Sequence, residues 1–452
     1  MKTRNKNEID MLNGPMVGRI VMMALPLAAI SILQQLFNAA DVAVVGRFAS
    51  DTALAAVGAN TPVINMFLTL LTGIATGGNV VISTLIGEGR HDKIRDAVHT
   101  VFTISLIGGV GIVVIGQIIA RPLLELIKVP DDVIGQSLTY LRIYLFAMMF
   151  AVIYNFASAI LRSKGDTRRP LYCLIASGII NVILNLVFVI GFSLDVVGVA
   201  TATLIANFTC ALATVIILMK EDGELKLDLK DLRLDTAPLK ITLRIGIPAG
   251  LQGMMFSVSN IIIQSGINSF GADCIAGNTA ALNYEFFTFF IISAFAQTAT
   301  TYTSQNYGAG NADRCRKVLK YSMLLGIGIC FALCMMIIAA PYFWLSFFTV
   351  DAAVLTYAMI RMHYVVCLEW LTGFNEIPAA TIRGMGVSLP PTLISITGSC
   401  ILRIIWMLTA FKWFHSNTTL MIVYPVSWIF LAAGMITLYM VVSRKKLAAI
   451  QK

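Results

Sequence analysis

The sequence predicts an all-α integral membrane protein, with twelve transmembrane helices arranged in two pseudo-symmetric lobes of six. Three observations support this class. Only 13% of the 452 residues are charged and 58% are hydrophobic, whereas a soluble chain of this size carries about 25% charged residues. The charged residues divide the chain into twelve long apolar runs. Motifs of the first half recur in the second half in the same order.

The positions of the charges define the spans, because a helix needs about 20 mostly apolar residues to cross the hydrocarbon of a bilayer. The predicted spans are residues 17–45, 53–86, 98–121, 138–161, 170–194, 196–219, 241–271, 275–306, 319–348, 354–382, 388–411 and 416–442. The eight cysteines lie mostly within these runs and show no CxxC or metal-ligand spacing. We therefore expect no disulfide framework and no bound cofactor.

The distribution of Lys and Arg predicts that both termini are cytoplasmic. In this orientation 26 of the 33 basic residues lie on cytoplasmic segments, in agreement with the positive-inside rule. Two others lie inside spans, Arg142 and Arg361, and five lie on outside loops: Arg47, Arg121, Lys128, Arg403 and Lys412. The net charge of +9 is thus explained by membrane topology, and no nucleic-acid partner is expected.

Four motifs repeat at a nearly constant offset, which places Pro248 opposite Pro26 and Gly386 opposite Gly165. The pairs are "ALPLAAI" with "GIPAGLQ", "GRFASD" with "NSFGAD", "GEGRHDKIR" with "GAGNADRCR", and "LRSKGDTRRP" with "IRGMGVSLPP". Each half contains an even number of spans, so the repeat is parallel and the substrate path is expected between the halves. The predicted domains are an N-terminal lobe (1–219), a cytoplasmic linker (220–240) and a C-terminal lobe (241–452).

Asp41 is the only charged residue between Ile20 and Val45. A carboxylate in or near hydrocarbon is costly and by default marks a functional site, although a helix end that touches water would also account for it. Asn181 and Asn185 are four residues apart, so they share one face of the fifth span. Thr203, on the sixth span, is expected at a similar depth.

Carboxylate, amide and hydroxyl oxygens are the ligands that hard cations accept, and the carboxylate can take up a proton instead. The sequence therefore predicts a coupling site formed by Asp41, Asn181, Asn185 and Thr203, for either H+ or Na+. The alternative for the asparagines is hydrogen bonding between helices, which is common in membrane bundles. The site is not duplicated, because Ile263 stands at the position that corresponds to Asp41.

The second half carries three acids within its spans: Glu285, Glu369 and Glu376. An acid at the centre of a spanning helix costs about 2.5–3.5 kcal/mol, so these side chains are not expected to face lipid. Glu369 and Glu376 are seven residues apart and are predicted to share a face. The three acids either line a cavity that receives cations or pair with Arg361, Arg383 or His363. The full set of expected substrate-lining residues is Gln34, Asn38, Met255, Glu285, Glu369 and Glu376.

Taken together, these motifs resemble the MATE (multidrug and toxic compound extrusion) family of bacterial transporters. The resemblance covers the chain from about Pro15 to about Ser443. Its carriers are "ALPLAAISILQQLFNAADVAVVGRF", "INVILNLVFVIG", "GVATATLIAN", "GIPAGLQGMMFSVSNIIIQSGINSFG", "TSQNYGAGNADR" and "AATIRGMG". It implies two six-helix lobes and drug efflux coupled to Na+ or H+. It also implies a cation site to which Asp41, Asn181 and Thr203 match residue by residue.

Two positions depart from the family pattern. Asn185 stands where the family has a second Asp, and Phe256 lies near the position of an acid that some members carry in the seventh helix. The resemblance therefore leaves the choice between H+ and Na+ open.

The sequence predicts a multidrug efflux antiporter of the bacterial inner membrane, a monomer that exports amphiphilic, cationic drugs or toxins. No nucleotide-binding domain or catalytic constellation is found, so an ion gradient is expected to drive transport and no enzyme activity is expected. The main alternative is a flippase for lipid-linked precursors. A flippase would need a basic cavity for phosphates, whereas the intramembrane charges lean acidic: Asp41, Glu285, Glu369 and Glu376 against Arg142 and Arg361.

Overall fold

The computed structural model describes residues 8–127 and 129–451, and every regular element among them is helical. Twelve helical segments are long and apolar enough to cross a membrane, which confirms the predicted number of spans. The basic residues Lys2, Arg4, Lys6, Lys128 and Lys452, which were used to assign the orientation, lie outside the described residues.

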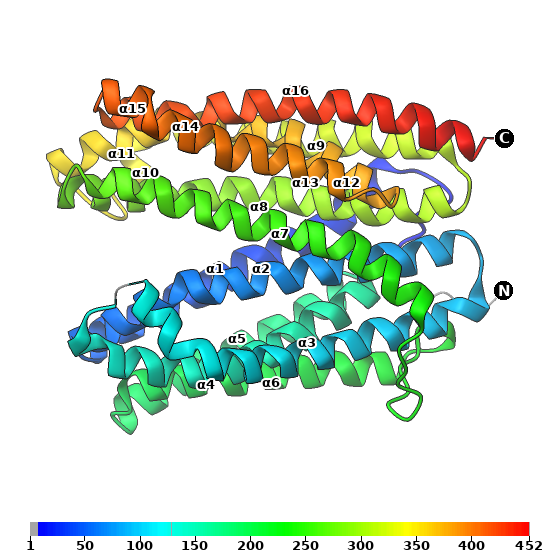
Figure 1. The fold of residues 1–452 in the computed structure, drawn as a ribbon, viewed down its shortest axis with the longest axis horizontal. Helices are drawn as coiled ribbons and strands as arrows, with labels where there is room; N and C mark the ends of the chain where they lie inside the picture. The colour runs from blue at the N-terminus through cyan, green and yellow to red at the C-terminus, as the bar shows by residue number, and fades with distance from the viewer. Residues whose placement is uncertain (1–7, 128, 452) are drawn as a thin grey trace. The chain divides into compact units, whose positions relative to one another are not determined.

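The first six spans are each built on one long helix. They are α1 (Val17–Phe48), α2 (Asp51–Gly87), α3 (His91–Leu126), α4 (Asp131–Ser163), α5 (Arg168–Leu186) and α6 (Asp195–Met219). A π-helical turn, Val187–Gly191, continues α5. A short 3-10 helix, Gly223–Leu225, lies in the linker before α7. The helices of this half run alongside one another in Figure 1.

The second half has more interruptions. Its helices are α7 (Thr236–Asn268), α8 (Ala272–Gly308), α9 (Ala312–Ala339), α10 (Pro341–Leu345), α11 (Ala352–Tyr364), α12 (Gly373–Gly384), α13 (Leu389–Ile396), α14 (Leu402–Leu408), α15 (Ala410–Trp413) and α16 (Asn417–Ala449). A 3-10 segment, Val366–Thr372, joins α11 to α12, and a π-helical turn, Thr397–Ile401, joins α13 to α14.

Three predicted spans therefore differ in detail from the structure. The span predicted at 319–348 ends earlier, at Ala339, because Pro341 cannot continue the helix and instead begins α10. The spans predicted at 354–382 and 388–411 as single helices are divided by 3-10 and π-helical turns. Hydropathy locates a membrane crossing but does not detect such local changes of helical pitch.

Packing divides the chain into two units. Unit 1 contains residues 8–9 and Ala29–Gly250, and unit 2 contains Asp10–Ala28 and residues 251–451. The divisions fall inside α1 and α7, two residues after Pro26 and Pro248 respectively. The whole linker and the first part of α7 thus pack with unit 1.

The internal repeat is visible in the backbone of each unit. Gly89 in unit 1 and Gly310 in unit 2, which occupy equivalent positions of the repeat, both have positive φ, at 66° and 74°. In unit 1, Asn79 donates to the carbonyl of Ala159 at 2.9 Å. In unit 2, Thr300 donates to the carbonyl of Ala380 at 3.2 Å, again at the equivalent positions. The two halves thus use the same contact between equivalent helices with different side chains.

Close glycine packing holds the first part of α7 to α2 within unit 1. A Cβ atom added at Gly73 or Gly77 of α2 would overlap the backbone of α7, and one added at Gly246 or Gly250 of α7 would overlap the backbone of α2. Both helices carry a GxxxG pattern, which allows the backbones of membrane helices to approach closely. The "TGIATGGN" stretch therefore serves helix packing.

Candidate functional site

Asp41 lies within α1, seven residues before the helix ends at Phe48. Its side chain is buried in unit 1, with 8% of the residue exposed. The possibility that Asp41 merely touches water at a helix end does not match this burial. The position that corresponds to Asp41 in the second half, Ile263, is a core residue of unit 2.

Two contacts between helices bring α1, α5 and α6 together at this point. Gly178 of α5 receives the ring of Phe37 from α1 so closely that any Cβ at Gly178 would overlap the ring. Ser177 of α5 donates to the carbonyl of Ala206 in α6 at 2.8 Å. Asp41, Asn181 and Thr203 each lie about one helical turn from one of these contacts, so the contacts set their relative positions.

The four predicted side chains form one hydrogen-bonded cluster. Asn185 donates from Nδ2 to Oδ1 of Asp41 at 2.5 Å and to Oδ1 of Asn181 at 3.4 Å. Thr203 Oγ1 lies 3.3 Å from Oδ2 of Asp41 and 3.0 Å from the carbonyl oxygen of Val199, and its single hydrogen is shared between these two acceptors. Asn181 completes the cluster by donating to Thr203 Oγ1 at 3.4 Å.

No basic residue bonds to Asp41 among the described residues. Its hydrogen-bond partners are an amide and a hydroxyl, both of them neutral. The aromatic residues Tyr140 and Tyr144 of α4 lie close enough to interact with it electrostatically. Neutral donors compensate a buried negative charge only in part.

One oxygen of the cluster has no partner. Oδ1 of Asn185 is buried and accepts no hydrogen bond, while its Nδ2 faces the carboxylate. This orientation suits an ionised Asp41, which can only accept hydrogen bonds. Asn185 lies in the last turn of α5, which ends at Leu186 just before the π-helical turn at Val187–Gly191, and such turns are frequent at functional sites.

The other expected substrate-lining residues lie at different depths. Asn38 and Gln34 lie one and two turns before Asp41 on the same face of α1, and Gln34 is half-buried while Asn38 is exposed. Met255 belongs to unit 2, where it is half-buried and its carbonyl accepts a contact from Cys400 Sγ at 2.9 Å.

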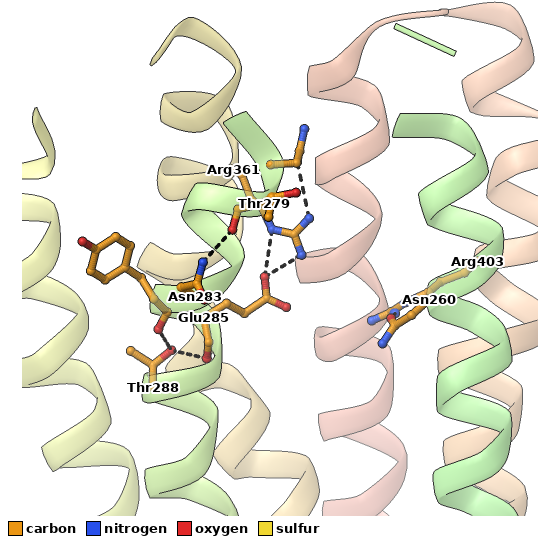
Figure 2. A network of polar contacts seen from close by, with 9 residues as sticks. Asn260, Thr279, Asn283, Glu285, Thr288, Arg361 and Arg403 are labelled. Atoms are coloured by element: carbon orange, nitrogen blue, oxygen red, sulfur yellow. Dashed lines mark hydrogen bonds and ion pairs between the residues drawn. The ribbon is translucent and has the colours of Figure 1, made fainter. Parts of the chain in front are cut away.

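Glu285 of unit 2 forms an ion pair with Arg361 (Figure 2). Oε2 of Glu285 accepts from Nη2 of Arg361 at 2.7 Å and from Nε at 3.0 Å, and Nη1 of Arg361 donates to Asn278 at 3.3 Å. This geometry matches the ion-pair alternative for Glu285. His363, which was considered as another partner, is exposed and contacts the carbonyl of Met359.

The charge distribution predicted that Arg403 lies on an outside loop. This prediction is wrong, because Arg403 is buried within α14 with 1% exposure. Its guanidinium lies 4.5 Å from the ring centre of Tyr424 and 5.7 Å from that of Phe256. It donates to Asn260 and Ser427 at 3.4 Å, and Figure 2 shows it beside Asn260. The predicted span 388–411 already contained Arg403, and the error lay in counting this single Arg among the charges of the outside loops.

This correction changes the charge inventory of the spans. Unit 2 contains Arg361, Arg383 and Arg403 against Glu285, Glu369 and Glu376. The acidic excess used to argue for cationic substrates is therefore absent from unit 2. In unit 1, Asp41 is a buried acid without a basic partner.

Glu369 and Glu376 do not share one helical face. Glu369 lies in the 3-10 segment and Glu376 in the first turn of α12, so the spacing of seven no longer corresponds to two turns of one α-helix. Glu369 is buried, with an unpartnered Oε2, and interacts electrostatically with Arg361 and Arg403.

Glu376 is half-buried and has different neighbours from Glu369. It accepts from Asn375 at 3.1 Å and interacts electrostatically with Arg383.

The site in unit 1 contains a single acid, and the described residues contain no group of three His, Cys, Asp or Glu placed to hold a metal.

Comparison with solved structures shows the fold. A structure described as the outward-facing conformation of a multidrug resistance MATE family transporter of the MOP superfamily superposes with a TM-score of 0.87, 22% identity and full coverage of both chains. A MOP superfamily transporter from Pyrococcus furiosus, described as having a binding pocket of reverse polarity, superposes with a TM-score of 0.84 at 22% identity, also over both whole chains.

Sequence relatives extend over most of the chain. The probable multidrug resistance protein YoeA of Bacillus subtilis is 28% identical over 84% of each chain. The multidrug export protein MepA of Staphylococcus aureus is 22% identical over 88% of each chain. The MatE family model matches twice, at residues 26–187 and 248–409, once in each half of the repeat. The chain therefore belongs to the MatE family, whose members are transporters rather than enzymes.

Proposed function

We propose that this protein is a multidrug efflux antiporter that exports amphiphilic cations in exchange for one monovalent cation per cycle at the Asp41 cluster. The observation that carries the proposal is the burial of Asp41 among neutral partners. A carboxylate in this setting is stable only when a positive charge compensates it. A drug cation and a coupling ion that compete for that charge are exchanged rather than transported together.

The relatives named as multidrug resistance and multidrug export proteins support the export of drugs. We further propose that the protein acts as a monomer in the bacterial inner membrane with both termini in the cytoplasm. The preference for cations now rests on the unit 1 site, because the charges of unit 2 are balanced.

We favour H+ as the coupling ion. A proton needs only Asp41, and the protonated carboxyl could then donate to Oδ1 of Asn185 if the amide turned over, which would satisfy an oxygen that has no partner in the present arrangement. Na+ would require several oxygen ligands at once. Asn185 would therefore have to rotate in the same way, and the Thr203 hydroxyl would have to turn its hydrogen away from Asp41.

The test is ethidium efflux from proteoliposomes with pH and Na+ gradients imposed separately. We expect the pH gradient to drive efflux and the Na+ gradient to have little effect. Efflux driven by Na+ alone would mean that the coupling ion is Na+ rather than H+, while the proposed coupling site at Asp41 would stand. If neither gradient drives any tested compound while a labelled lipid precursor is flipped, the antiporter proposal is wrong and the flippase alternative is favoured.

A further inference from the structure

Arg403 stands in unit 2 at the position that corresponds to Asn181 in unit 1. The MatE family model matches residues 26–187 and 248–409, two stretches whose first residues and last residues are each 222 positions apart. At this offset Arg403 of α14 corresponds to Asn181 of α5. The repeat therefore places Arg403 at the point of unit 2 that is equivalent to the carboxylate cluster of unit 1.

The π-helical turn Thr397–Ile401 sets this register. Before the turn, Pro391 follows Pro170 by 221 positions. A π-helical turn closes its hydrogen bonds from i to i+5, so it takes in one residue more than an α-helical turn. The offset therefore grows to 222 after the turn, and Arg403 lies just beyond it. Without the extra residue an apolar side chain, that of Leu402, would stand at this position.

The neighbours of Arg403 follow the same correspondence. Nη1 of Arg403 donates at 3.4 Å to Oδ1 of Asn260 in α7, which lies beside it in Figure 2. Asn260 corresponds to Asn38 of α1 at the offset of 222. Each asparagine lies one turn before the equivalent positions of Asp41 and Ile263. The two units thus carry charges of opposite sign at equivalent places, an acid in unit 1 and an arginine in unit 2.

No carboxylate neutralises Arg403 by direct contact. Among the described residues Arg403 takes part in none of the ion pairs. Its Nε and Nη2 both reach the hydroxyl of Ser427 at 3.4 Å, the same distance at which Nη1 reaches Asn260. These contacts are to neutral groups and are longer than the usual N–H···O distance of about 2.9 Å. A buried charge held in this way remains poorly compensated.

Two acids of unit 2 interact electrostatically with Arg403, but neither forms an ion pair with it. Oε2 of Glu285 accepts from both Nε and Nη2 of Arg361. Glu369 lies in the 3-10 segment, where it interacts electrostatically with both arginines and its Oε2 has no partner. The formal balance of charge in unit 2 therefore leaves the N–H groups of Arg403 without a carboxylate.

The side chains that cover Arg403 from α7 are themselves partly exposed. Asn260 is half-buried, and Phe256, one turn earlier on the same face, is 40% exposed. The guanidinium lies 5.7 Å from the ring centre of Phe256 and 4.5 Å from that of Tyr424 in α16. Movement of the two α7 side chains would admit a small planar group to the guanidinium.

We propose that Arg403 and Asn260 form an anion site in unit 2, which binds a carboxylate or another planar monovalent oxyanion. The planar guanidinium can donate two parallel N–H bonds to such a group. The amide of Asn260 can turn to donate a third. The site goes beyond the proposed cation exchange at Asp41, which requires no anion.

The test is equilibrium binding of radiolabelled benzoate to the purified full-length protein in a chloride-free choline–HEPES buffer. Benzamide, which has a similar shape without the charge, serves as the neutral control ligand. We expect saturable binding of benzoate and none of benzamide. The measurement imposes no gradient, so its outcome does not depend on whether the protein exchanges drugs for protons. Absence of saturable benzoate binding overturns the proposal.

Competition by nitrate distinguishes two sources of the anion. Displacement of benzoate by nitrate would mean that a free inorganic anion can occupy the site. Benzoate binding that depends on Arg403 but resists nitrate would mean that the site takes the carboxylate of an amphiphilic molecule. Both results keep the anion at Arg403.

Two variants locate the bound anion. Arg403→Gln should weaken benzoate binding about tenfold or more, as for loss of a hydrogen bond to a charged group. Asn260→Asp places a carboxylate against Arg403, so it should fill the site from within and abolish benzoate binding without lowering the melting temperature. Arg142→Gln removes an exposed arginine from α4 of unit 1 and is the matched control, expected to bind benzoate normally. Unchanged benzoate affinity in Arg403→Gln or in Asn260→Asp overturns the site.

Discussion

Asn185 reaches across from α5 to donate a 2.5 Å hydrogen bond to Asp41 in α1, a contact between residues 144 positions apart in sequence. The donor occupies the position where the resemblance to the MATE family leads one to expect a second acid. The site therefore holds one negative charge when empty. Asn185 also retains an unpartnered oxygen that can face the same carboxyl group after rotation.

Asp41→Asn is expected to abolish coupled efflux while leaving the fold intact. The amide is similar in shape to the carboxylate, but it carries no negative charge and takes up no proton near neutral pH. Gradient-driven ethidium efflux in proteoliposomes should fall to the protein-free rate, with an unchanged melting temperature. Efflux at the rate of the unmodified protein would mean that Asp41 has no part in coupling.

Asn185→Asp is expected to raise the number of cations exchanged per drug cation. A second carboxylate beside Asp41 doubles the negative charge of the empty site, and like charges in a buried site strongly favour uptake of a further positive charge. The measurement is the membrane potential at which net transport reverses, compared with the unmodified protein. An unchanged reversal potential would mean that residue 185 does not share its charge with Asp41.

Glu285→Gln is expected to destabilise unit 2 and to reduce transport of cationic and neutral dyes equally. Removing one partner of a buried ion pair costs about 3–5 kcal/mol, because the other charge is left uncompensated. The double variant Glu285→Gln with Arg361→Gln removes both charges and should recover much of the melting temperature. A selective loss of cationic dye export at unchanged stability would instead assign Glu285 to the substrate path.

Glu376→Gln serves as the contrasting case. Glu376 is half-buried and accepts a hydrogen bond from a neutral amide, that of Asn375. We expect this variant to weaken export of cationic dyes more than export of neutral ones, because attraction between charges strengthens as the local dielectric falls. Equal losses for both dyes would indicate that Glu376 has a structural role.

Gly178→Ala is expected to impair transport through the geometry of the site. The new methyl group would displace the ring of Phe37, and with it the turn of α1 that carries Asp41. Overpacking of this kind costs about 1–3 kcal/mol, measurable as a lower melting temperature. Gly58→Ala is the matched control, since a Cβ there meets no atom within 4 Å. Normal efflux by Gly178→Ala would show that the Phe37 contact does not position Asp41.

The sequence alone determined the class of fold and much of the unit 1 site. Charge depletion and span length fix the number of crossings, because the thickness of the bilayer requires about 20 mostly apolar residues for each crossing helix. The spacing of Asn181 and Asn185 fixes a shared helical face. Asn181 donates a hydrogen bond to Thr203, and Asn185 donates one to Asp41. Local periodicity was sufficient here because each participating helix is regular at these residues.

Tertiary structure decided what depends on packing between helices. Arg403 is a single charge in an apolar stretch, which in sequence can equally mark a loop. Only its position between Tyr424 and Phe256 shows that it is buried. Glu369 and Glu376 do not lie on one helical face, because the backbone changes from a 3-10 helix to an α-helix between them. Glu285 of α8 is neutralised by Arg361 of α11, a helix far along the chain. Hydropathy measures each residue against lipid or water, whereas the charge state of a buried group depends on which side chains the fold brings within a few ångströms.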